Sequence, residues 1–106
     1  MVTYNREAIF HALADSRRRE ILDLLRGGEC PAGSIAGRFS VTRPAISRHL
    51  RVLRDAGLVL CRKDAQARLY RLNAEAFHEL DRWLERYRIY WAARLQDLKR
   101  FVEEGP

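Results

Sequence analysis

The sequence has few cysteines and no long apolar run, and these shortages exclude several classes of protein. Its two cysteines, Cys30 and Cys61, are 31 positions apart and form no Cys-x-x-Cys motif, so no disulfide framework is expected. The longest apolar run, from Ile89 to Ala93, has five residues, whereas a helix needs about 20 to cross a bilayer. A membrane protein, collagen, a repeat array and a secreted disulfide-rich mini-domain are therefore excluded.

Signals for targeting, metal binding and catalysis are also scarce. The first ten residues, MVTYNREAIF, contain no basic cluster followed by an apolar core. We therefore expect no secretory signal and a cytoplasmic location. The three histidines are scattered, and Ser47 and His49, two positions apart on a helix, would face different sides with no carboxylate partner. We expect no metal, no cofactor and no enzymatic activity.

The chain does contain a strong concentration of basic residues. It has 106 residues, 47% apolar and 32% charged, which predicts a single domain over residues 1–106. The net charge is +6, but residues 38–71 alone hold nine basic and two acidic residues and carry +7. Such a basic region is typical of a protein that binds a polyanion, because neutralised phosphates release counterions. A solvated arginine-rich surface without a partner is the alternative.

Hydrophobic periodicity predicts a mainly α fold with a small β-hairpin. Asp15 and Thr42 are suitable N-caps, Pro44 suits a first helical turn, and Gly57 suits a helix end. The alternation after Gly57 predicts two strands, joined by a turn at residues 64–66. About five helices are expected, at residues 4–14, 16–26, 32–39, 42–57 and 74–103, with the strands at residues 58–63 and 67–72.

The last predicted helix is too long for so small a domain. Thirty residues span roughly 45 Å, and the apolar stripe continues along the whole length. An exposed apolar stripe of this kind is expected to pack against another surface, and a second copy of the chain is the simplest one. The alternative is that the helix folds back onto its own chain. We expect a homodimer formed through the N- and C-terminal helices. The candidate dimerisation residues are Phe10, Trp83, Tyr87, Tyr90, Trp91, Leu95 and Leu98. For the four aromatic residues Trp83, Tyr87, Tyr90 and Trp91, a ligand pocket between protomers is the alternative.

Residues 34–50, SIAGRFSVTRPAISRHL, predict a helix-turn-helix, and the basic hairpin that follows would be its wing. The apolar residues, Val41 among them, fall at inward positions and leave a donor-rich outer face that fits a major groove. We expect Arg43, Ser47 and Arg48 to contact base edges. Contacts to the DNA backbone are expected from Thr42, Arg51, Arg54, Lys63 and Arg68.

Residues 12–25 and 43–59, ALADSRRREILDLL and RPAISRHLRVLRDAGLV, resemble the ArsR/SmtB family of bacterial winged helix-turn-helix repressors. The tryptophan- and tyrosine-rich pattern of residues 83–98 is similar to a branch that lacks the usual metal sites. The resemblance implies a homodimer on an inverted-repeat operator that overlaps its own promoter. It also favours a DNA-proximal His49, with a place at the junction between helices as the alternative.

The sequence departs from the family pattern at two positions. Ser16, in a first helical turn, replaces a proline. Ser40 replaces the usual glycine between the two helices of the helix-turn-helix, and a serine with positive φ there would strain the backbone. The positions of the family's paired metal-binding thiolates hold Pro31 and Gly33, and His78 has no partner histidine. Cys30 and Cys61 are expected to be small buried residues, with thiol sensing as the alternative.

The sequence as a whole predicts a sequence-specific, homodimeric DNA-binding repressor, with double-stranded DNA and itself as partners. A thiol- or ligand-responsive sensor of the same fold remains open. A protein-interaction module, with a long helix that captures another chain and an incidental basic face, is the alternative from a different class.

The basic run at Arg17, Arg18 and Arg19 either contacts phosphate or is simply solvated.

Overall fold

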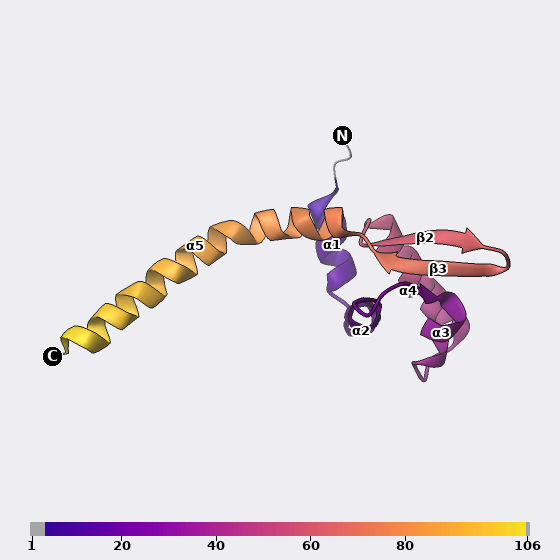
Figure 1. The fold of residues 1–106 in the computed structure, drawn as a ribbon, viewed down its shortest axis with the longest axis horizontal. Helices are drawn as coiled ribbons and strands as arrows, with labels where there is room; N and C mark the ends of the chain where they lie inside the picture. The colour runs from indigo at the N-terminus through magenta and orange to yellow at the C-terminus, as the bar shows by residue number, and fades with distance from the viewer. Residues whose placement is uncertain (1–3, 106) are drawn as a thin grey trace.

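A computed structural model describes residues 4–105 as five helices and a three-stranded antiparallel sheet. Short helices α1 to α3 and the longer α4 surround one face of the sheet, and α5 leaves this body as a single rod (Figure 1). This is the predicted winged helix-turn-helix with one additional strand. The elements are α1 (Arg6–Leu13), α2 (Ser16–Leu25), β1 (Cys30–Pro31), α3 (Ala32–Gly37), α4 (Arg43–Asp55), β2 (Val59–Asp64), β3 (Ala67–Leu72) and α5 (Ala74–Glu104).

The helix boundaries follow from capping side chains. Asp15 accepts a hydrogen bond from the Arg18 amide at the start of α2, and Thr42 accepts one from the Ala45 amide at the start of α4. Both predicted N-caps are thus confirmed. Asn73 caps α5 by accepting from the Glu75 amide. The chain leaves α4 through Gly57, whose φ of 82° is a conformation that favours glycine.

The turn between α3 and α4 differs from the expected one. Ser40 does not have positive φ, because Ala65 is the only non-glycine residue with positive φ among residues 4–105. Helix α3 ends at Gly37, two residues earlier than predicted, so the longer connection needs no left-handed residue at Ser40. Val41, predicted to face inward, is 37% exposed in this connection.

The core lies between helices α1 to α4 and the sheet. Its fully buried members come from α1 to α4 and β2, including Ile9 of α1, Ile35 of α3, Leu53 of α4 and Val59 of β2. Burying a side chain of this size stabilises the fold by about 1.5–3 kcal/mol. The core therefore fixes α4 against α2 and the sheet, and so determines which face of α4 remains outside.

The third strand, β1, was not predicted. Cys30 and Pro31 were expected to open the helix of residues 32–39, but they pair with Tyr70 and Leu69 of β3. Pro31 has the extended dihedrals φ −66° and ψ 148° and serves as the N-cap position of α3. β1 thereby joins the start of α3 to β3. Strands β2 and β3 form the hairpin that we call the wing.

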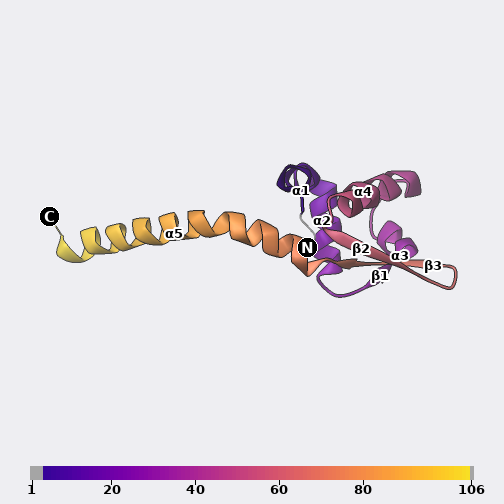
Figure 2. The same cartoon turned by 90° about the horizontal axis from the view of Figure 1, so that it is seen from above.

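Helix α5 extends far from the body (Figure 2). The molecule measures 66 × 36 × 22 Å and has a radius of gyration of 18.5 Å, whereas a compact chain of this length would have about 13 Å. Every residue from Leu84 to Gly105 is exposed. Within residues 4–105, no helix combines a membrane-spanning length with sufficient apolar character.

Candidate nucleic-acid interface

The outer face of α4 carries hydrogen-bond donors and no acidic residue until its last position. Ile46, Leu50 and Leu53 turn into the core, and the helical period places the polar residues on the opposite side. The solvent-exposed residues of α4 and its N-cap are Thr42, Arg43, Pro44, Ser47, Arg48, Arg51, Arg54 and Asp55. The structure thus brings together all the residues of this helix predicted to contact DNA, except His49.

A cleft of about 570 Å³ separates the C-terminal half of α4 from the wing. Its walls carry three guanidinium groups, from Arg51 and Arg54 of α4 and Arg68 of β3, and a single carboxylate, Asp55. Within residues 4–105, none of these arginines forms an ion pair with a carboxylate. Unpaired guanidinium groups around a cleft are suited to phosphate oxygens.

The wing contributes a further pair of basic side chains. Lys63 of β2 is the direct cross-strand partner of Arg68 of β3, and both are exposed near the tip of the hairpin. Arg68 also lines the cleft beside Arg51 and Arg54 of α4, so basic side chains occur on both the α4 side and the wing side of the cleft.

Arg62, next to Lys63, is engaged within the chain. Its Nε and Nη2 atoms each donate to a carboxylate oxygen of Glu29 at 2.8 Å. This hydrogen-bonded pair lowers the pKa of the Glu29 carboxyl below its usual value of 4.5. Sequence reasoning missed Glu29, because only the pairing of β1 with β3 brings residue 29 near the wing.

The three consecutive arginines of α2 also have partners inside the protein. Arg17 pairs with Glu20 at 2.8 Å and lies over the Phe39 ring. Arg18 and Arg19 donate to main-chain carbonyls at the end of α1. These internal contacts argue against simple solvation of the run, and a phosphate contact stays a prediction.

His49 lies on the side of α4 that faces α2, and its side chain is 23% exposed. Its Nδ1 is 3.4 Å from Arg18 Nη1 and 4.0 Å from Asp15 Oδ1. The Arg18 amide, and to a smaller extent His49, lower the pKa of Asp15 below its usual 3.8. The placement corresponds to the helix-junction alternative for His49; a DNA contact remains a prediction.

The two cysteines flank Tyr70 on the sheet. Cys30 of β1 and Cys61 of β2 are both cross-strand partners of Tyr70 of β3, so two strand spacings, roughly 9.5 Å, separate their Cα atoms. A disulfide requires Cα atoms within about 7 Å, which excludes this bond within one chain in this geometry. Burial, followed by the interaction with Cys61, raises the pKa of Tyr70.

Within residues 4–105, no three His, Cys, Asp or Glu side chains cluster as metal ligands.

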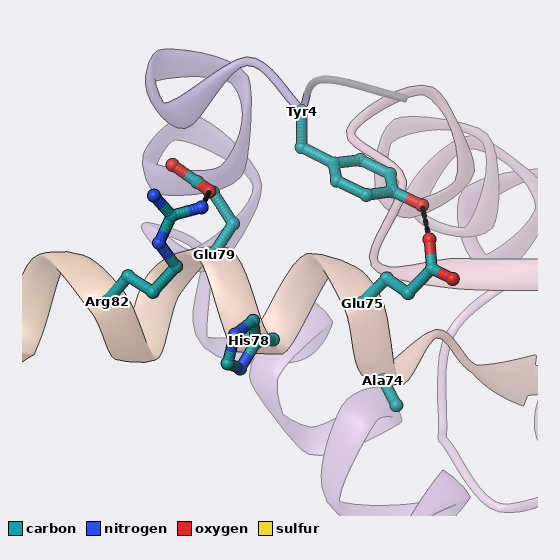
Figure 3. A pocket seen from close by; sticks show the side chains of 6 residues that line it. All are labelled: Tyr4, Ala74, Glu75, His78, Glu79 and Arg82. Atoms are coloured by element: carbon teal, nitrogen blue, oxygen red, sulfur yellow. Dashed lines mark hydrogen bonds and ion pairs between the residues drawn. The ribbon is translucent and has the colours of Figure 1, made fainter. Parts of the chain in front are cut away.

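The root of α5 is fixed to the body by a hydrogen-bond network. The buried Asn73 side chain donates to Tyr4 Oη at 2.9 Å and to the Gly57 carbonyl at 2.8 Å. Figure 3 shows Tyr4 reaching Glu75, and Glu79 paired with Arg82, around a pocket of about 320 Å³. Glu79 also accepts from Arg6 of α1 at 2.9 Å. These bonds determine the direction in which α5 leaves the domain.

An aromatic surface begins where α1 meets α5. Phe10 packs edge-on against Trp83 at a centroid distance of 4.9 Å, and Trp83 in turn lies 4.9 Å from Tyr87. Beyond this point the predicted dimerisation residues Tyr87, Tyr90, Trp91, Leu95 and Leu98 are all exposed, Trp91 by 62%. Phe101 and Val102 extend the stripe to the end of the helix.

Comparison with known proteins agrees with this architecture. Residues 15–60 match the family model described as a bacterial regulatory protein of the arsR family. The transcriptional repressor SdpR of Bacillus subtilis is 38% identical over 76 residues, covering 72% of this chain and 84% of SdpR. The HTH-type transcriptional regulator Rv2034 of Mycobacterium tuberculosis is 34% identical over 97% of this chain and 94% of its own length.

Solved structures show the same likeness. The ArsR-like transcriptional regulator from Rhodococcus sp. RHA1 superposes with a TM-score of 0.70 at 36% identity, over 89% of each chain. A second ArsR family regulator, RHA00566, gives a TM-score of 0.74 at 29% identity, over 81% of this chain and 94% of its own. Members of this family bind DNA and are not enzymes. The chain belongs to the ArsR family of DNA-binding transcription regulators.

Proposed function

We propose that the protein is a homodimeric repressor that binds an inverted-repeat operator, including one at its own promoter. The observation that carries the proposal is the combination of a donor-rich α4 face with an unpartnered apolar face on α5. The first gives each chain one DNA-binding surface, made of α4, its N-cap Thr42 and the wing, which we call the reading head. The second provides a surface through which two heads can be joined with two-fold symmetry.

Within each head, the roles of the side chains follow from their positions. Arg43, Ser47 and Arg48 lie on the N-terminal half of α4, the part that contacts base edges in helix-turn-helix proteins. Thr42 and Arg51 are assigned to the adjoining DNA backbone. Arg54 and the wing residues Lys63 and Arg68 are assigned to phosphates, because they border the cleft or the wing tip.

The need to cover α5 supports the dimer. Isolated apolar side chains on a surface are ordinary, but a continuous aromatic and aliphatic stripe is typical of an interface. Tyr and Trp are also the residues that contribute most to binding energy at interfaces. In a dimer the two copies of α4 would occupy successive major grooves, about 34–36 Å apart.

Selection from a random-sequence duplex library with the purified protein tests the proposal. We expect an enriched inverted repeat, a dimer in sedimentation equilibrium, and a steep fall in affinity with salt. Enrichment of a direct repeat or a single half-site, or no enrichment, would refute the proposed recognition. No enrichment together with capture of another protein chain by α5 would favour the protein-interaction module. Binding to the duplex upstream of the protein's own gene tests autoregulation.

A further inference from the structure

Arg18 of α2 contacts both α1 and α4. Its Nε donates to the Ala12 carbonyl at 2.7 Å and its Nη2 to the His11 carbonyl at 3.0 Å, both in the last turn of α1. Its remaining nitrogen, Nη1, lies 3.4 Å from Nδ1 of His49 on α4. One guanidinium group thus spans the end of α1 and the inner side of α4.

These contacts use the planar fork that only arginine provides. A guanidinium group presents five donors in fixed directions and has no acceptor. Because Arg18 can only donate, the contact is a hydrogen bond in the neutral His49 tautomer that carries its proton on Nε2 and accepts through Nδ1. Asp15, at 4.0 Å from Nδ1, is the other charged group at this junction. Both Arg18 and His49 are partly buried, so the junction is screened less than an exposed pair.

We propose that Arg18 is a positioning residue that holds α4 at a fixed orientation relative to α1 through His49, and so determines the half-site spacing that the dimer accepts. The inference rests on the proposed function, because spacing has meaning only for two joined heads. Helix α1 carries Phe10, which packs on Trp83 of α5. The proposed dimer surface on α5 therefore contacts α1, and α1 is joined to α4 through Arg18 and His49.

Arg19 offers a matched control. Its Nη1 donates to the Leu13 carbonyl at 2.7 Å, so it also caps α1, but no hydrogen bond joins it to α4. Arg18→Met and Arg19→Met each remove a cap of α1, and only R18M removes the link to His49. The probe is the duplex selected by the unaltered protein, with versions that have one base pair inserted or deleted between the half-sites.

We expect R18M to bind the selected duplex about tenfold more weakly, the loss of a hydrogen bond to a charged group, and to discriminate less between the three spacings. R19M should match the unaltered protein in both respects. If R18M does not fold, Arg18→Lys replaces it, since one ammonium cannot reach both helices. In a double-mutant cycle, R18M and His49→Asn should be non-additive.

Several outcomes would overturn the inference. Equal effects of R18M and R19M would mean that capping α1 is the whole role of Arg18. An equal loss of affinity by R18M for all three spacings would mean that Arg18 supports DNA binding without affecting spacing. Additive effects of R18M and H49N would mean that Arg18 does not act through His49. If the unaltered protein selects no inverted repeat, the proposed function fails, and the inference fails with it.

Discussion

Glu29 binds Arg62 through both of its carboxylate oxygens, each at 2.8 Å from a guanidinium nitrogen. Glu29 precedes β1 and Arg62 lies on β2, so the arginine reaches across the central strand β3. The pair neutralises one of the positive charges of the wing. It also keeps β2 of the wing attached to the segment that leads into α3.

This pairing predicts an effect of removing the Glu29 charge. Glu29→Gln should free Arg62 to contact a phosphate, which raises affinity for random duplex and steepens the dependence of log K on log salt by about one unit. Salt titrations followed by fluorescence anisotropy would measure the slope. Glu20→Gln, which releases Arg17 on α2, is the control and should leave the slope unchanged. An unchanged slope in E29Q would show that Arg62 cannot reach DNA.

Arg48 and Arg68 should differ in what they contribute to binding. Arg48→Ala is expected to weaken binding to the selected duplex by about 1–3 kcal/mol and to relax sequence preference, because Arg48 is assigned to a base edge. Arg68→Ala should weaken binding to all sequences alike, because Arg68 borders the phosphate cleft. Titrations against selected and random duplexes separate the two patterns. Equal losses of R48A on both duplexes would contradict the base-reading role.

Local signals predicted much of the fold. Asp15 and Thr42 mark helix starts because the capping bond lies within three residues of the cap. The apolar period likewise identified the inner face of α4, and therefore its outer, arginine-rich face. These features require only neighbouring residues, so they can be read from one chain.

Features that depend on distant contacts were missed. β1 is two residues long and exists only because Tyr70 and Leu69 lie beside it. The partners of Arg18 and Arg62 are likewise carbonyls and side chains that the folded core brings near. The direction of His49 followed from the packing of α4 on α2, which periodicity alone does not give.

The tip of the wing carries local backbone strain that a glycine would relieve. Ala65 has φ 54° in the two-residue loop between Asp64 and Ala67. A left-handed conformation costs a residue with a Cβ about 1–2 kcal/mol, and glycine often occupies the first loop position of a type II′ hairpin. Ala65→Gly should therefore raise the free energy of unfolding by up to about 1 kcal/mol, after the greater entropy of glycine in the unfolded chain is subtracted.

Chemical denaturation of A65G, compared with Ala67→Gly, tests this assignment. Ala67 pairs with Asp64 as the first residue of β3, so glycine there should be destabilising. A lower stability for A65G than for the unaltered protein would contradict the strain at Ala65. Affinity for DNA should change little in A65G, since the charged wing residues are retained.

Trp91 and Ile89 provide the sharpest test of the α5 interface. Both are exposed to a similar extent, 62% and 66%, but two residues on a helix are separated by about 200°, so they face opposite sides. Trp91 belongs to the stripe with Tyr87, Leu95 and Leu98, and Ile89 does not. Trp91→Asp should weaken dimerisation by at least about 2 kcal/mol, as expected for an interface tryptophan. Ile89→Asp should have an effect within about 0.5 kcal/mol, as at an ordinary surface position. Sedimentation equilibrium would report both constants, and a dimer that dissociates more in I89D than in W91D would place the interface on the other face of α5.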